Sequence, residues 1–325
     1  MGISDLAGFS EPLKKFIEVV SNGIGALYGP YLIRRNADSK AYEIRAIASA
    51  VGESQKLIGK IEYDNNGLVL TSGNVTIDSE KDSTLNVYAR ATSRLNYQQI
   101  KKQINLEQII SLAADELSNE TIVSEEPVDD DWISRFFNLA EDVNSKEMKI
   151  LWAKILAGEV KKPKSYSLRT MELLKNISIK EAGLFSKVSQ FAISCINKAF
   201  LPRIASFNEF GIEYSDLLLL EELNLITGIE SNIKYTSHDK TLSFINSGLF
   251  LVVERNDTTE LNIGSIPFTR LGVELLALVE VLPANINYLK KFASIFLKEG
   301  EVLKYGTILS KNDDESFKCS ALVDL

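Results

Sequence analysis

A basic stretch in the middle of the chain has the clearest chemical potential. Residues 161–175 contain five Lys or Arg side chains and one acid, Glu172, which gives a local charge of +4. Ser165 and Ser167 stand where a helix is expected to begin, and the free backbone N–H groups of a helix start favour anions. A site that contacts phosphate, nucleic acid or an acidic protein is therefore predicted from Lys161, Lys162, Lys164, Ser167 and Arg169. The alternative is that these are solvated side chains around a capping turn.

An acidic stretch comes before this basic one. Residues 125–131 contain five Asp or Glu side chains, which could be interpreted as a carboxylate metal site. We favour a simpler interpretation, in which Asp130 or Asp131 caps a helix that begins at Trp132 and the neighbouring acids stabilise its positive end. Trp132 and Trp152 are predicted to be core residues, because aromatic side chains at helical spacing usually bury their rings.

Few other side chains could support catalysis or bind a metal. The chain contains one His, His238, and two Cys, Cys195 and Cys319. This count excludes zinc sites with four Cys or His ligands, and it allows a catalytic triad only if that triad uses His238. We expect His238 to lie in a solvated turn and Cys195 to be buried and inert within a helix. We therefore predict a protein without enzymatic activity, metal or cofactor, while carboxylate ligands that converge from distant positions stay open.

Length and charge limit the function classes further. The chain has 325 residues, enough for two or three domains, and its 45% hydrophobic and 25% charged residues are usual for a soluble globular protein. The net charge of −8 divides into −2 for residues 1–120, +1 for residues 121–200 and −7 for residues 201–325. A general duplex-binding surface is basic, so the last third is a poor candidate for nucleic acid binding.

The sequence also indicates a location. The first residues lack the basic and apolar regions of a signal peptide, and no apolar run is long enough for a transmembrane helix. Two cysteines far apart in the sequence suit a reducing compartment. We therefore expect a cytoplasmic protein.

The elements that must position these residues are predicted to be mostly helical in the first two thirds. Apolar residues at helical spacing predict helices over residues 11–21, 30–50, 84–117, 132–143 and 145–158. Ser145 is the predicted cap of the last of these, and Ser178 that of a long helix over residues 180–199. Residues 57–83 are rich in Asn, Gly, Ser and Thr and predict either a small hairpin or a mobile insertion.

The last third is predicted to mix helices and strands. Strands are expected within residues 231–254 and near the C-terminus, and Thr269 is the expected cap of a helix. Two phrases here, LLLLEELNLIT at 217–227 and PFTRLGVELLALV at 267–279, resemble the elements of winged-helix proteins. Because this region is acidic, the resemblance implies a protein-binding or structural module rather than a DNA reader.

The middle third carries a second resemblance. Residues 129–185, from DDDWISRFF to KEAGLF, resemble the bacterial family built around domain of unknown function 2806, and residues 88–117 extend the likeness more weakly. The phrase LWAKILAGE at 151–159 is also similar to helical proteins of the abortive-infection alpha type. By association, this second likeness implies a role in defence against phage.

Together these observations predict a mainly α, multidomain protein. We expect a helical region over residues 1–120, a central helical bundle over residues 121–200 and a winged-helix-like α+β domain over residues 201–325. The predicted function is protein–protein contact and self-assembly into a homo-oligomer, with a phage or host protein as a further partner. The helices at 11–53 and 84–118 are the hypothetical surfaces for self-association. A nucleic-acid-binding regulator and a membrane-surface effector are the alternatives.

Overall fold

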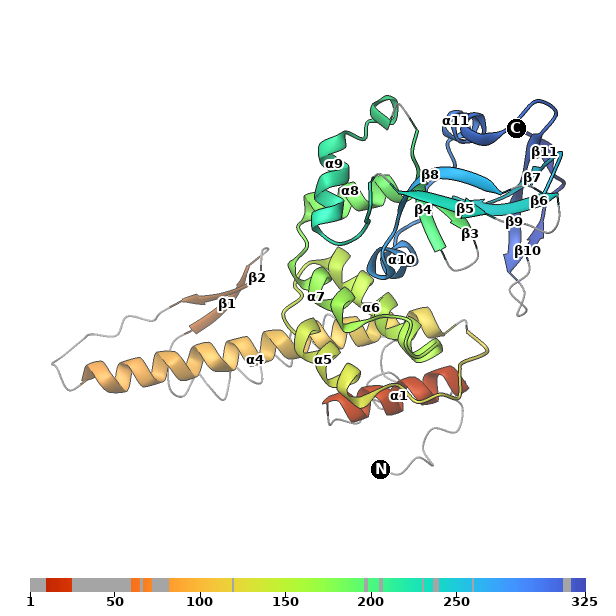
Figure 1. Ribbon diagram of the computed structural model, residues 1–325. Coiled ribbons are helices and arrows are strands. Elements are labelled where there is room, and N and C mark those ends of the chain that lie inside the picture. The colour runs from red at the N-terminus through yellow and green to blue at the C-terminus, as the bar shows by residue number, and fades with distance from the viewer. Residues whose placement is uncertain are drawn as a thin grey trace. The chain divides into compact units, whose positions relative to one another are not determined.

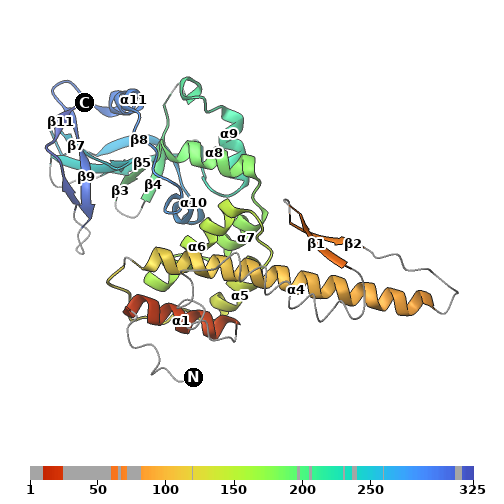
Figure 2. The same ribbon diagram turned by 180° about the vertical axis from the view of Figure 1, so that it is seen from behind.

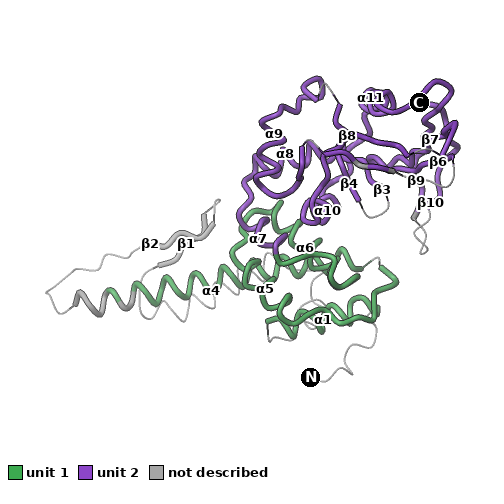
Figure 3. The backbone as a smooth tube through the Cα atoms, in the orientation of Figure 1, with its two compact units in different colours: residues 1–168 green, residues 169–325 purple. Residues whose placement is uncertain are grey.

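The computed structural model describes the chain as two compact units, residues 1–168 and residues 169–325 (Figure 3). The described residues are 10–24, 60–64, 67–71, 82–118, 120–195, 198–204, 207–229, 231–235, 240–258, 260–311 and 317–325. The helix predicted at residues 30–50 and the turn predicted around His238 lie outside these ranges.

In its described residues the first unit contains four helices and a hairpin (Figure 1). The helices are α1 (Glu11–Ile24), α4 (Asp82–Leu117), α5 (Asp130–Ala140) and α6 (Lys146–Lys161). Strands β1 (Lys60–Asp64) and β2 (Gly67–Thr71) pair in antiparallel fashion, as one of the two interpretations of residues 57–83 predicts.

The predicted helix caps of this unit are confirmed at one position and wrong at another. The Ser145 side chain accepts a hydrogen bond from the backbone N–H of Met148 at 3.2 Å, which starts α6 as expected. Helix α5 is capped by Asp129, which accepts from the N–H of Trp132 at 2.8 Å, and not by Asp130 or Asp131. Those two acids instead lie in the first turn, where they still favour the positive end of the helix dipole.

The core of the first unit is aromatic. The rings of Trp132 and Phe136 stack with their centroids 5.2 Å apart, and Phe136 packs in turn against Trp152. Both tryptophans are buried, as predicted, and the indole N–H of Trp132 donates to the backbone carbonyl of Tyr166 at 2.8 Å. The aromatic core thus fixes the turn that follows α6.

The second unit combines helices with one large antiparallel sheet (Figure 2). Its helices are α7 (Leu168–Asn176), α8 (Ile179–Ser189), the short 3-10 helix η2 (Phe207–Phe210), α9 (Tyr214–Glu222), α10 (Arg270–Leu276) and α11 (Ile286–Phe296). Its strands are β3 (Ile193–Cys195), β4 (Lys198–Pro202), β5 (Asn232–Tyr235), β6 (Thr241–Asn246), β7 (Leu249–Glu254), β8 (Leu261–Pro267), β9 (Val302–Lys311), β10 (Phe317–Cys319) and β11 (Val323–Asp324).

The order of these strands overturns the predicted fold class. They join in one sheet of nine strands in the order β10-β9-β7-β6-β3-β4-β8-β5, with β11 also paired to β9. The protein is therefore not mainly α, and the second unit is not a winged-helix domain, which has only a small sheet. One helix start within the two phrases is confirmed, because Thr269 caps α10 as predicted. The strands between them belong to the larger sheet.

The long helix predicted over residues 180–199 is also wrong. Ser178 does cap α8, with Glu181 completing a capping box, but the helix ends at Ser189. Residues 193–195 and 198–202 form β3 and β4, with Ile193 opposite Phe200. A short apolar run fits either a helix or a strand, and here pairing with β6 and β8 decides for the strands. Cys195 consequently lies half-buried in β3, where burial raises the pKa of its thiol.

Aromatic side chains hold helix α11 on the sheet. The Phe244 ring on β6 meets the ring of Phe292 on α11 edge-to-face at 5.7 Å. The Tyr288 hydroxyl on α11 donates to the backbone carbonyl of Phe191 at 2.6 Å, and this tyrosine is fully buried. Removal from water raises the pKa of Tyr288 well above its ordinary value, so its hydroxyl keeps its proton and stays a donor.

Close packing in the second unit generates a stability prediction from two helical glycines. A Cβ added at Gly272 in α10 would lie 2.0 Å from the backbone carbonyl oxygen of Leu225, whereas one added at Gly183 in α8 meets nothing within 4 Å. We expect Gly272→Ala to lower the free energy of unfolding by about 1–3 kcal/mol or more, because backbone must shift to relieve the overlap. The control Gly183→Ala should raise it by about 0.5–1 kcal/mol. Urea unfolding followed by far-UV circular dichroism measures both, and equal effects at the two sites would contradict the packing described.

Candidate functional site

The basic turn, defined as residues 161–167 between α6 and α7, is held by a buried carboxylate. Glu159 is 2% exposed and accepts hydrogen bonds from the backbone N–H groups of Lys164 at 2.5 Å and Tyr166 at 3.0 Å. Lys164 adopts a left-handed backbone conformation with φ of +69°, which is strained for a residue with a side chain. The two bonds to Glu159 stabilise this conformation, so the turn is a preformed structure.

Two lysines of the basic turn pair with acids of the segment that precedes α5, residues 120–129. Lys161 Nζ lies 2.6 Å from Glu120 Oε1, and Lys164 forms an ion pair with Glu126. The hydrogen bond to Glu126 raises the pKa of Lys164. The backbone N–H of Ser124 also donates to the carbonyl of Lys161 at 3.0 Å. Two regions that the sequence suggests as separate sites are therefore one intramolecular contact.

Helix α1 also binds the segment that precedes α5. Lys15 Nζ donates to the backbone carbonyls of Ser124 and Glu126, both at 2.7 Å. Partial burial lowers the pKa of Lys15, although Glu126 and other acids oppose this effect. Among the residues that the structure describes, no group of His, Cys, Asp or Glu side chains could hold a metal ion.

The other predicted site residues do not join these ion pairs. Lys162 is exposed, and within the described ranges it has no acidic partner. The Ser165 hydroxyl donates to the carbonyl of Lys162 at 2.6 Å, and Ser167 immediately precedes α7. Arg169 is exposed and belongs to the second unit. A ligand for this turn must compete with Glu120 and Glu126, and its binding there stays a prediction.

Helix α4 has a second surface that sequence analysis only partly anticipated. The helix has 36 residues, which correspond to about 54 Å. From Asn105 onward one of its faces is buried against α5, α6 and α1, by Leu106, Ile109, Ile110, Ala113 and Leu117. Between Val87 and Ile104, by contrast, none of the side chains that the structure describes is buried. Both views show the first part of α4 extending beyond α1, α5 and α6 (Figures 1 and 2).

The apolar face of α4 continues beyond the part that α5, α6 and α1 cover. Leu95, Lys102 and Ile109 are seven residues apart, so they lie nearly in line along the helix. Ile109 is completely buried, Lys102 forms an ion pair with Glu141 at the border, and Leu95 is 52% exposed. Val87 and Ala91, two turns and one turn before Leu95, extend the same stripe, and Val87 is 54% exposed.

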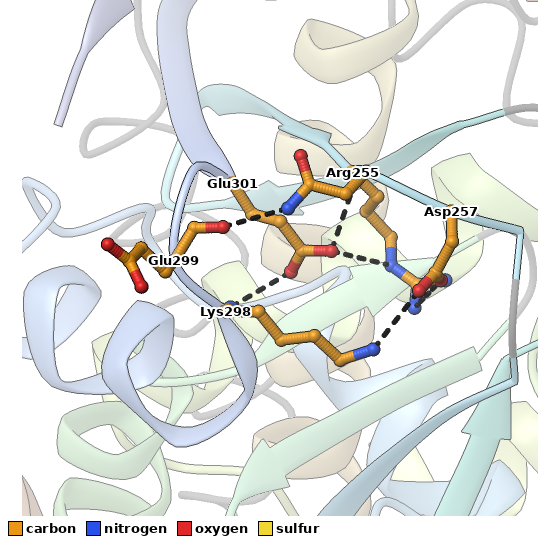
Figure 4. A network of polar contacts seen from close by, with 6 residues as sticks. Arg255, Asp257, Lys298, Glu299 and Glu301 are labelled. Carbon is orange, nitrogen blue, oxygen red and sulfur yellow. Dashed lines mark hydrogen bonds and ion pairs between the residues drawn. The ribbon is translucent and has the colours of Figure 1, made fainter.

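A polar network in the second unit was not predicted at all. Arg255 follows β7, Glu301 precedes β9, and both side chains are 1% exposed with Arg255 Nε 3.8 Å from Glu301 Oε1 (Figure 4). Asp257 accepts from Arg255 at 3.3 Å and lies 3.2 Å from Lys298 Nζ. Two cations thus face two carboxylates, and the network ties two loops together. No motif signals it, because Arg255 and Asp257 are separated from Lys298 and Glu301 by about forty residues of sequence.

Comparison with known proteins gives one match. Residues 89–293, more than half of the chain, match the family described as "Protein of unknown function (DUF2806)". No curated protein matches the chain, and no solved structure matches it. In the part of the chain that the structure describes, no helix is both long and apolar enough to cross a membrane.

The basic turn generates a prediction for two glutamates. We expect Glu159→Gln to lower the free energy of unfolding of the first unit by about 1–3 kcal/mol, because the uncharged amide binds the two buried N–H groups less well. The matched variant Glu120→Gln breaks only the exposed pair with Lys161 and should change stability by less than about 1 kcal/mol. Both tryptophans of the chain lie in the first unit, so intrinsic fluorescence during urea unfolding reports on this unit. Equal losses in the two variants would show that Glu159 does not hold the turn.

Proposed function

The chain belongs to the DUF2806 family, whose function is unknown, and we propose that it is a non-enzymatic protein that assembles with further copies of itself through the first half of α4. The observation that carries this proposal is the stripe Val87–Ala91–Leu95, which continues the buried face of α4 without any cover among the described residues. Apolar surface that leaves water is stabilised by about 25 cal/mol per Å², so a second helix on this stripe is favoured.

A second copy of the chain is the occupant that fits this stripe. Val87, Ala91 and Leu95 are uncharged, and so is Gln98 in the next turn. Two identical stripes can therefore meet through uncharged residues, and Ala91 lets the two backbones approach closely. Arg94, seven residues after Val87, lies at the edge of this contact. An isologous contact of this kind closes on itself and gives a dimer.

Other helical surfaces named by the sequence are less suited to self-association. Helix α1 buries Phe16, Ile17, Val19 and Val20 within the first unit, against α5 and α6. The same packing argues against a membrane-surface role for α1, because its apolar face would have to leave the core. The second half of α4 is buried as well, so among the residues that the structure describes the hypothesis of self-association narrows to residues 87–104.

We further propose that this assembly acts in the bacterial cytoplasm, in defence against phage. Two features support this setting: the likeness of residues 151–159 to abortive-infection proteins, and two cysteines that are both free, as in a reducing compartment. A phage or host protein is the proposed trigger.

Self-assembly is tested by the mass of the protein in solution. Light scattering should give the wild-type chain a mass of at least two copies, and Leu95→Glu should give a single copy, because the change places two carboxylates in the contact. Thermal stability of the first unit should be nearly unchanged, since Leu95 is half-exposed within one chain. The control Ile179→Glu changes a more exposed apolar residue of the second unit and should keep the wild-type mass. A wild-type protein that stays monomeric at its highest soluble concentration would overturn the proposal.

The defence setting is tested in cells. Bacteria that express the wild-type chain should reduce phage plaque numbers relative to cells with an empty vector, and cells with Leu95→Glu should lose that protection at equal protein level. Protection by the monomeric variant would separate the defence role from assembly, and unchanged plaque numbers with every phage tested would remove the defence role.

A further inference from the structure

We propose that the outward face of α9 binds a basic amphipathic helix of another protein. This face is defined by five residues of α9 and its end: Tyr214, Leu218, Leu219, Glu222 and Leu223. It lies in the second unit, whereas the proposed self-association uses the first unit, so neither contact requires the other. The basic turn and the apolar stripe of α4 do not contribute to it.

Helix α9 has apolar side chains on every side, although one side is exposed to solvent. Residues 217–220 are four consecutive leucines, which a helix distributes around its whole circumference. Leu217 and Leu220 are buried in the second unit, with exposed fractions of 4% and 0%. Leu218 is 46% exposed, and Leu219 is partly exposed. A helix that is apolar all round is normally buried, and the described residues cover only the inner side of α9.

The outward side of α9 has the spacing that helix packing uses. Tyr214, Leu218 and Glu222 follow one another at intervals of four residues and form one row along the helix. Leu219 and Leu223 belong to the neighbouring row. A second helix packs by placing a row of its own side chains in the groove between two such rows. Both views show α9 beside α8 at one end of the second unit, away from β9 and β11 (Figures 1 and 2).

The charge around α9 indicates which kind of helix fits. Residues 207–229 contain five acids and no Lys, Arg or His. Glu209 is paired with Lys291. The other four acids form no ion pair with any residue that the structure describes: Glu213, Asp216, Glu221 and Glu222. An apolar face beside carboxylates without cationic partners favours a helix whose own apolar face is flanked by Lys or Arg.

The same charges disfavour other occupants of this face. Two copies of the face in contact would bring carboxylates together, and like charges across an interface are unfavourable. Nucleic acid and anionic lipid are repelled for the same reason. An extended basic peptide satisfies the charge but has no helical row to place between the two rows of α9. A basic amphipathic helix satisfies both the charge and the spacing.

Tyr214 and Leu218 are the expected anchors of this contact. Tyr214 is 60% exposed, and tyrosine is enriched among the residues that carry most of the binding energy in protein interfaces. Its ring can be buried against a partner while its hydroxyl keeps a hydrogen bond to water. Glu222 lies one turn after Leu218 and is exposed, so its carboxylate can pair with a Lys or Arg of the partner helix.

Fluorescence anisotropy with the full-length chain tests this proposal. The probe is a labelled synthetic helix of about 18 residues with leucines on one face and lysines on the other, and a second probe has glutamate in place of each lysine. We expect the basic probe to bind with an affinity that falls as KCl rises from about 50 to 200 mM, and the acidic probe not to bind. Tyr214→Gln/Leu218→Gln should weaken binding by about tenfold or more, because it removes both anchors without changing the charge.

Matched controls change the same kinds of side chain elsewhere in the second unit. Leu309→Gln/Val323→Gln removes two apolar residues that are 63% and 50% exposed, and it should bind the basic probe as the wild type does. Glu222→Lys should weaken binding about threefold or more and reduce its salt dependence, whereas Glu299→Lys at another exposed acid should leave both unchanged. Circular dichroism shows whether each variant is folded, and the Glu222→Lys comparison tests the proposal if the double variant on α9 does not fold.

Several results would overturn the proposal. They are no binding of the basic probe to the wild-type chain at about 50 mM KCl, equal binding of the two probes, and equal losses in the α9 variants and their controls. Light scattering supplies a further check, because Leu218→Gln should keep the wild-type mass. A lower mass for this variant would show that a second copy of the chain occupies the face, in place of a basic partner helix.

Discussion

The first unit depends on the burial of one face of a single long helix. Helix α4 presents an apolar face from Val87 to Leu117, and among the residues that the structure describes α5, α6 and α1 cover its second half and not its first. The border lies where Lys102 pairs with Glu141 and where the buried amide of Asn105 donates to the Glu141 carbonyl at 2.9 Å. Beyond that border the same face continues through Leu95 in contact with water. The described residues leave this stripe uncovered, which supports the proposal that a second helix packs on it.

Several charged side chains of the first unit form ion pairs with one another. Glu120 and Glu126, which precede α5, form ion pairs with Lys161 and Lys164 of the basic turn. Glu159 accepts a hydrogen bond from the backbone of the same turn and holds its conformation. Exposed pairs of this kind contribute little stability each, and the buried carboxylate contributes more.

Local features of the fold could be predicted from the sequence, and long-range ones could not. Ser145, Ser178 and Thr269 cap helices as their neighbours indicate, and α4 begins within two residues of the predicted start, because caps and helical spacing act over a few residues. The residues after Ser189 illustrate the limit. Strand β3 pairs locally with β4, but its place in the large sheet also depends on Ile245, about fifty residues later, which pairs with Ser194, and no local signal carries that pairing.

The candidate sites show the same limit. The lysines of the basic turn are visible in the sequence, but their pairing with Glu120 and Glu126 depends on how α5 and α6 pack. Arg255 and Glu301 are ordinary charged residues in the sequence and become a buried pair only when β7 and β9 lie side by side. Conversely, the covered and uncovered halves of α4 look alike as sequence, since both have apolar residues at helical spacing.

Pairing of α4 with a second copy is tested most directly by pulsed dipolar spectroscopy on a chain with Cys195→Ser and Cys319→Ser and a spin label at Asn96→Cys, an exposed position beside Leu95. We expect a dipolar coupling between labels on two chains that disappears when labelled protein is diluted with unlabelled protein. A folded, labelled protein that shows no coupling between chains at any concentration would contradict self-assembly through α4.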